Sequence, residues 1–121
     1  MKKIILLFIL LSSLSFSSQI YNFEFEQVDL LNIVVNDKYD GYRYFEGTLK
    51  NKTDQKIIIL NFEIKYRDEN ARKNTPYSSV GKINIYSLGP QETTDFITYV
   101  DVTNIEGLDF KIEISNIILR W

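Results

Sequence analysis

Residues 58–67 decide the fold of this chain, and they read Ile58-Ile59-Leu60-Asn61-Phe62-Glu63-Ile64-Lys65-Tyr66-Arg67. Apolar side chains occupy every second position from Ile58 to Tyr66, and the positions between them are mostly polar or charged. Because successive side chains of a strand point to opposite faces of a sheet, this alternation predicts a half-buried β-strand with one apolar face. The turn-forming cluster Asp68-Glu69-Asn70 marks the end of the strand.

The same alternation recurs on both sides of this stretch. It predicts further strands within residues 21–25, 44–50, 80–88, 94–100 and 108–115, and a mixed apolar run predicts another within residues 28–35. These segments are rich in the β-branched and aromatic residues that strands favour. The polar segment 51–55 leads us to expect that 44–50 and 58–67 form a hairpin. No long stretch carries the apolar stripe of a helix, although residues 27–35 are also compatible with a short helix.

Several short strands separated by polar turns predict an all-β fold. We expect an immunoglobulin-like antiparallel β-sandwich of six to eight strands, with a closed barrel as the alternative architecture. The chain of 121 residues suits a single domain of this kind, which we place at residues 18–121. The predicted core takes its apolar side chains from the inward strand faces: Phe45, Leu49, Leu60, Phe62, Ile64, Ile83, Phe96, Phe110 and Ile112.

The amino-acid composition excludes several kinds of catalytic and metal-binding site. It contains no histidine and no cysteine, and its formal net charge is -2. The missing residue types remove the commonest zinc ligands, the thiol nucleophile, disulfides and the usual general base. A mildly acidic chain is also poorly suited to nucleic acid, which binds basic surfaces. We therefore expect a protein that is not an enzyme and has no catalytic residue, cofactor, metal or nucleic-acid partner.

The N-terminus has the pattern of a secretory signal peptide. Lys2 and Lys3 precede an unbroken apolar run over residues 4–11, and small residues follow up to Ser17. The run is shorter than the roughly 20 residues that span a bilayer, so we expect cleavage after Ser17 and no membrane span afterwards. Removal of residues 1–17 takes away both lysines and lowers the formal charge from -2 to -4. The expected location is secreted or periplasmic, in a bacterium.

Three segments between residues 30 and 114 share features with a known domain type. They are the strand end Glu46-Gly47-Thr48-Leu49-Lys50-Asn51, the apolar strand Phe62-Glu63-Ile64-Lys65-Tyr66-Arg67-Asp68, and the turn Leu88-Gly89-Pro90-Gln91-Glu92 with Phe96 beyond it. On these segments the chain resembles the FxLYD domain and related bacterial extracytoplasmic immunoglobulin-like modules. It departs from them where Arg67 separates Tyr66 from Asp68 and where Gly89 precedes Pro90. The resemblance implies a β-sandwich that binds a partner or assists an envelope assembly, and it supplies no catalytic residue.

Three tyrosines are the candidate binding residues. Tyr39, Tyr42 and Tyr44 cluster in the sequence, and Tyr42 and Tyr44 share the strand face opposite Phe45. Exposed tyrosines offer a large contact area at low entropic cost, which suits a sugar or a protein partner. Alternatively, these side chains cover a neighbouring strand. Residues 36–41 have some features of a calcium loop, with Asp37 and Asp40 as ligands, but Lys38 occupies a ligand position and a polar turn fits better.

These features together predict an exported, non-enzymatic β-sandwich that acts as a binding or accessory module at the bacterial cell envelope. The partner is expected to be a protein or another envelope component. Two alternatives remain open: a structural subunit of a surface assembly, and a small inhibitor of an extracellular enzyme. The polar segment 68–79 is the candidate inhibitory loop, and it carries Arg72 and Lys73.

Overall fold

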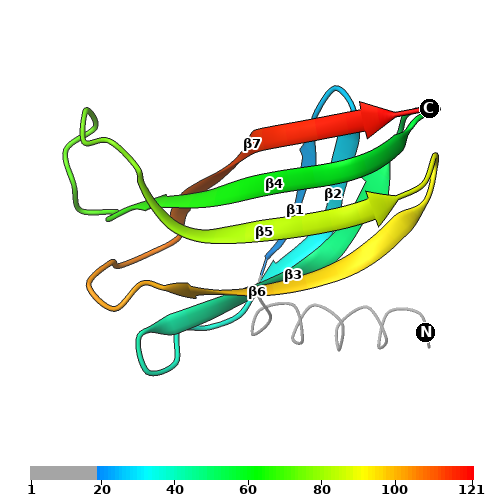
Figure 1. The fold of residues 1–121 in the computed structure, drawn as a ribbon. Coiled ribbons are helices and arrows are strands. Elements are labelled where there is room, and N and C mark those ends of the chain that lie inside the picture. Colours follow the sequence, from blue (N-terminus) through cyan, green and yellow to red (C-terminus); the bar gives the residue numbers. More distant parts are fainter. Residues whose placement is uncertain (1–18) are drawn as a thin grey trace, which may run out of the picture.

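The structure, a computed structural model, describes residues 19–121, which form seven β-strands and no helix (Figure 1). The strands are β1 (Ile20–Glu24), β2 (Val28–Val35), β3 (Tyr42–Asn51), β4 (Lys56–Arg67), β5 (Ser78–Leu88), β6 (Thr93–Asp101) and β7 (Asp109–Arg120). The signal peptide expected at residues 1–17 lies outside this described range. Residues 19–121 contain no helix long and apolar enough to cross a membrane.

The strands form two antiparallel sheets that pack as a β-sandwich, which confirms the predicted fold class. The first sheet has the order β1-β2-β3-β6 and the second has the order β5-β4-β7. The two sheets approach each other along one side, where the Thr98 hydroxyl of β6 donates to the Lys82 carbonyl of β5 at 3.1 Å. Constant-type immunoglobulin domains divide their strands into ABED and CFG sheets. In this protein β2 and β3 pair within one sheet. The protein and the constant-type immunoglobulin domain therefore share the sandwich architecture but differ in strand order.

The expected hairpin between residues 44–50 and 58–67 is wrong. These segments lie in β3 and β4, which belong to different sheets, because β3 pairs with β2 and β6 while β4 pairs with β5 and β7. The intervening residues carry the chain across the sandwich. The buried Asn51 amide holds this crossing in place, since its Nδ2 donates to the carbonyls of Gln55 at 2.8 Å, Leu88 at 3.2 Å and Gly89 at 2.9 Å.

The core lies between the sheets and is built from their inward faces. Every predicted core residue except Phe110 is buried; Phe110 is half-buried and packs edge-on against Phe45, with ring centroids 5.1 Å apart. Ile57 rather than Ile58 points inward, because a register shift between Ile57 and Ile59 changes the phase of the strand. Further buried side chains, absent from the predicted set, are Val28, Leu30, Ile33, Val35, Ile57, Tyr66, Leu88, Val100 and Val102.

The segment 28–35, which was compatible with a short helix, is strand β2. A register shift between Leu31 and Val34 marks a bulge at Asn32, whose φ is +55°. The Asn32 N–H donates to Asn22 Oδ1 at 2.9 Å, which ties the bulge to β1. Because the bulge adds a residue, Leu30 and Ile33 both point into the core, and this explains why the apolar run shows no simple alternation.

Candidate functional site

The polar segment before β3 is a tight two-residue turn. Tyr39 and Tyr42 exchange backbone hydrogen bonds of 2.8 and 2.9 Å, with Asp40 and Gly41 between them. Asp40 has φ +52° and Gly41 has φ +84°, and two positive φ values are typical of a type I′ turn. This geometry agrees with the interpretation of residues 36–41 as a turn. In residues 19–121 no group of three or more acidic side chains gathers as a metal site would require.

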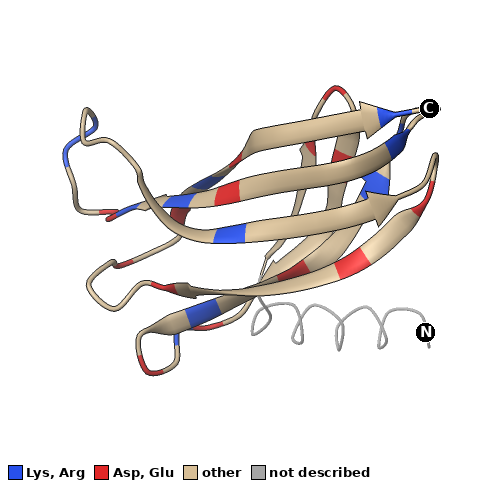
Figure 2. Cartoon of the chain, viewed as in Figure 1, with Lys and Arg blue, Asp and Glu red and all other residues tan. Residues whose placement is uncertain are grey.

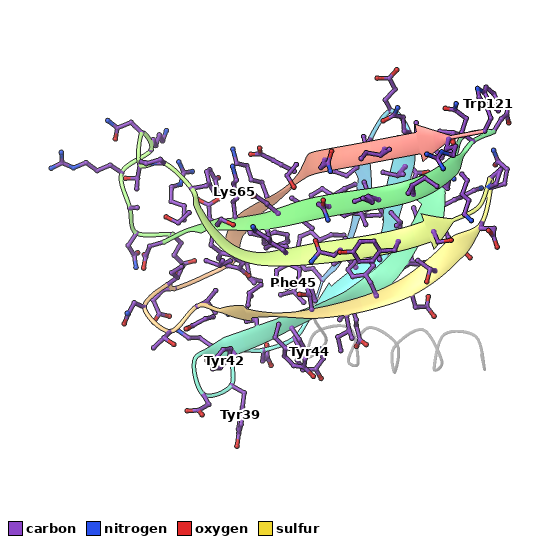
Figure 3. The ribbon with its side chains drawn as sticks, viewed as in Figure 1. Tyr39, Tyr42, Tyr44, Phe45, Lys65 and Trp121 are labelled. Atoms are coloured by element: carbon purple, nitrogen blue, oxygen red, sulfur yellow. The ribbon has the colours of Figure 1, made fainter. Side chains whose placement is uncertain are left out.

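The predicted binding tyrosines lie on the outer face of the first sheet and in the turn that precedes β3. Figure 3 shows Tyr39, Tyr42 and Tyr44 projecting from β3 and its turn, while Phe45 lies between the sheets. Tyr39 is 84% exposed at the tip of the turn, and Tyr42 is 49% exposed. Tyr44 is 36% exposed, because the ring of Tyr99 packs against it.

A fourth tyrosine, which the sequence reasoning missed, completes this surface. Tyr99 of β6 lies directly opposite Tyr44 in the antiparallel register, and their ring centroids are 5.4 Å apart. Tyr99 is itself 64% exposed, and its strand neighbour on the same face, Ile97, is 52% exposed. We call the side chains of Tyr42, Tyr44, Ile97 and Tyr99 the tyrosine face. Tyr44 therefore contacts a neighbouring strand and still offers exposed area, while its role in binding stays a prediction.

Carboxylates border the tyrosine face. Glu46 lies opposite Ile97, and Asp101 lies opposite Tyr42. A shallow hollow around two of the carboxylates is lined by Asn32, Val34, Glu46, Gly47, Thr48, Asp95 and Phe96. Across the described residues, no lysine or arginine nitrogen forms an ion pair with Glu46, Asp95 or Asp101. Figure 2 shows the resulting acidic segments on β3 and β6. The surface therefore combines aromatic area with unneutralised negative charge.

Local hydrogen bonds hold two of these carboxylates. The Thr48 hydroxyl donates to Asp95 Oδ1 at 2.9 Å across the two strands. The hydroxyl and backbone N–H of Thr103 donate to Asp101 Oδ1 at 2.6 and 3.1 Å, and they lower the pKa of that carboxyl. Both carboxylates are thus oriented by the fold, and the lowered pKa keeps Asp101 ionised at neutral pH. They act as fixed negative charges toward anything that docks on the tyrosine face.

A second polar cluster anchors the loop between β4 and β5. Arg67 Nε contacts Asp109 Oδ2 at 2.9 Å, and Arg67 Nη1 donates to the Lys73 carbonyl at 2.7 Å. The Tyr77 hydroxyl donates to Asp109 Oδ1 at 2.5 Å, and this bond lowers the pKa of Asp109 and raises that of Tyr77. The cluster ties the long polar loop to β4 and β7, which indicates a structural role for these residues.

One buried hydroxyl has no hydrogen-bond partner among the described protein atoms. Tyr66 is 1% exposed, and burial raises the pKa of its phenol to about 12. Its ring stacks on Phe110 with centroids 5.6 Å apart. A neutral phenol with so high a pKa is a packing residue and cannot supply a base.

Comparison of the chain with protein-family models, with curated proteins and with solved structures finds no match.

Proposed function

We propose that this protein is an exported, non-enzymatic β-sandwich that binds a protein partner or another envelope component through the tyrosine face. The observation that carries the proposal is the exposed pair of Tyr44 and Tyr99 on the outer side of the first sheet. The N-terminal signal pattern supports the expectation of export, and the resemblance to bacterial envelope modules supports a binding or accessory role.

Tyrosine is an efficient contact residue. Its ring buries a large area with few rotatable bonds, and its hydroxyl can still bond to a partner or to water. The Tyr44 and Tyr99 rings already restrain each other, so part of the ordering cost of binding is met before the partner arrives. The bordering carboxylates Glu46, Asp95 and Asp101 favour a partner whose contacting surface is basic.

The test is a cross-linking comparison in the native envelope. The wild-type protein, the double variant Tyr44→Ser/Tyr99→Ser and the matched control Tyr86→Ser are cross-linked in parallel, and the adducts are identified. Tyr86 is a good control because it is 66% exposed but lies on β5 in the other sheet. We expect a specific adduct with wild type and control that disappears with the double variant. An adduct that survives in the double variant, or no adduct in any sample, contradicts the proposal.

The fold of each variant needs an independent check. All three proteins should show the same strand signal by circular dichroism and similar midpoints of urea unfolding, because the changed side chains are exposed. A double variant that keeps its fold and loses the adduct assigns the loss to the tyrosine face.

Enzyme inhibition is a second candidate that one observation favours. The loop between β4 and β5 is exposed but pinned through Arg67, and it presents Arg72 and Lys73. A rigid exposed loop loses little entropy on binding, which is typical of inhibitory loops. A screen of extracellular proteases with the wild type and an Arg72→Ala/Lys73→Ala variant tests this alternative.

A further inference from the structure

The structure leaves one long strand edge open. Each sheet ends in two edge strands: β1 and β6 in the first, β5 and β7 in the second. β1 has only 5 residues, and β5 and β6 lie against each other where the sheets meet. By contrast β7 has 12 residues and, within the described chain, pairs only with β4 (Figure 1). An edge of this length presents unpaired N–H and C=O groups that can template another strand.

The first half of β7 is the regular part of this edge. From Asp109 to Ile114 it pairs with β4 residue by residue, and the register shifts only beyond Ile114, where Asn116 faces Asn61. The extra residue there is Ser115, whose hydroxyl donates to the Asn61 carbonyl at 3.2 Å. Because a bulge twists a strand and interrupts pairing, the usable template is confined to residues 109–114.

The charges of this segment are poorly matched to β4. In the register Lys111 lies directly opposite Lys65, and Glu113 lies directly opposite Glu63. Like charges in directly opposite positions are destabilising. Two other contacts relieve the mismatch: Lys111 Nζ lies 2.9 Å from Glu113 within β7, and Lys65 Nζ lies 3.6 Å from Glu113 diagonally across the strand pair. Exchange of Lys111 and Glu113 would give two attractive direct pairs, so intramolecular pairing does not explain the order of these charges.

The same order is matched to a second copy of the strand. In an antiparallel pair centred on Ile112, Lys111 of each chain lies opposite Glu113 of the other, and both direct pairs are attractive. On the inward side Phe110 lies opposite Ile114 of the second chain, and both residues are half-buried in one chain alone. Pairing would therefore cover apolar area as well as neutralise charge.

We propose that two copies of this protein associate through β7, antiparallel and centred on Ile112, so that the two β5-β4-β7 sheets become one continuous sheet. The contact is isologous, since the same residues on both chains meet across a two-fold axis. It closes on itself and produces a dimer rather than a fibre. The tyrosine face lies on the other sheet and stays free, so each dimer would carry two copies of it.

A charge-swap series measured by sedimentation equilibrium tests the proposal. The mature wild-type protein is compared with Glu113→Lys, Lys111→Glu and the double exchange Lys111→Glu/Glu113→Lys. Each single variant places like charges opposite one another twice, so we expect the dimer dissociation constant to rise about tenfold or more. The double exchange restores both attractive pairs and should return the constant to near its wild-type value. Lys82→Glu, on the edge strand β5, is the matched control and should leave the constant unchanged.

Several results of this series would overturn the proposal. A wild-type protein that stays monomeric at every concentration, single variants that dimerise as well as wild type, or a double exchange that fails to restore the dimer each overturns the proposal. Association beyond the dimer does so as well, because the contact is closed. Urea unfolding of each variant shows that it is folded, so that loss of the dimer is not mistaken for loss of the fold.

Discussion

Asn51 is the polar residue on which the crossing between the sheets depends. It is 0% exposed, and its Nδ2 donates to three main-chain carbonyls, those of Gln55, Leu88 and Gly89. Its Oδ1 accepts hydrogen bonds from the backbone N–H and the hydroxyl of Thr53 at 2.9 and 2.7 Å. One side chain therefore joins the end of β3, the loop that follows it and the end of β5.

Replacement of Asn51 by Ala removes all of these bonds at once. A buried hydrogen bond contributes about 1 kcal/mol net, and a buried group left without a partner costs about 1–3 kcal/mol. Two of the carbonyls keep another donor, since Thr53 Oγ1 also bonds to Gln55 and the Glu92 N–H bonds to Gly89. We therefore expect Asn51→Ala to lower the free energy of unfolding by about 3 kcal/mol, a large share of the roughly 5–15 kcal/mol of a typical domain.

Urea unfolding followed by circular dichroism measures this loss. Asn61→Ala is the control, because Asn61 is half-buried on an outer face and should cost less than about 1 kcal/mol. Asn51→Asp should be worse than Asn51→Ala at neutral pH, since it faces a carboxylate toward three carbonyl oxygens, and its deficit should shrink in acid as the carboxyl is protonated. An Asn51→Ala protein within about 0.5 kcal/mol of wild type would refute the role of this amide in holding the crossing.

Three further predictions concern the core and the pH dependence. Phe62→Ala should lower the free energy of unfolding by about 3–5 kcal/mol in urea, because Phe62 is 0% exposed between the sheets; an unchanged midpoint would contradict this placement. Tyr66→Phe should match wild type within about 1 kcal/mol or exceed it, since it removes a buried hydroxyl that has no protein partner, and a larger loss would show that the hydroxyl is bonded. The Tyr77 hydroxyl lowers the pKa of Asp109, and Lys111 lowers the pKa of Glu113. The two ionised carboxylates therefore stabilise the fold fully above their unfolded-state pKa values near 4. This stabilisation is lost as the pH falls through their lower folded-state pKa values. The melting temperature should thus be flat from pH 7 to pH 5 and fall below about pH 4, and a fall already complete at pH 5 would argue against this assignment.

Much of the sandwich could be predicted because alternation is a local property. Each strand carries its inward and outward faces in its own residues, so β3, β4, β6 and β7 were recognisable, and the burial of Phe62 and Ile64 followed directly. The predicted inward face of β4 was wrong at Ile58, where an extra residue changes the phase of the strand. A bulge depends on the partner strand and leaves no clear mark in the sequence of one strand.

In the candidate site, too, some residues could be predicted from the sequence and others could not. Tyr42 and Tyr44 could be placed on an outer face because they alternate with Phe45 within one strand. Tyr99 could not be joined to them, because nothing in its own neighbourhood indicates that β6 pairs with β3. The carboxylates that border the tyrosine face could not be predicted as a group for the same reason, since Glu46 and Asp95 come from separate strands that only the sheet brings together.

By itself, the sequence determined where most of the strands lie, which face of most strands is apolar, and which reactive residue types the chain lacks. Those properties follow from side-chain identity at a spacing of two residues. Only the tertiary structure decided that β3 and β4 enter different sheets, that Tyr44 meets Tyr99, and that β7 remains an open edge with like charges opposite β4. The reason is that strand order and register depend on contacts between residues far apart in the chain, and no local pattern records those contacts.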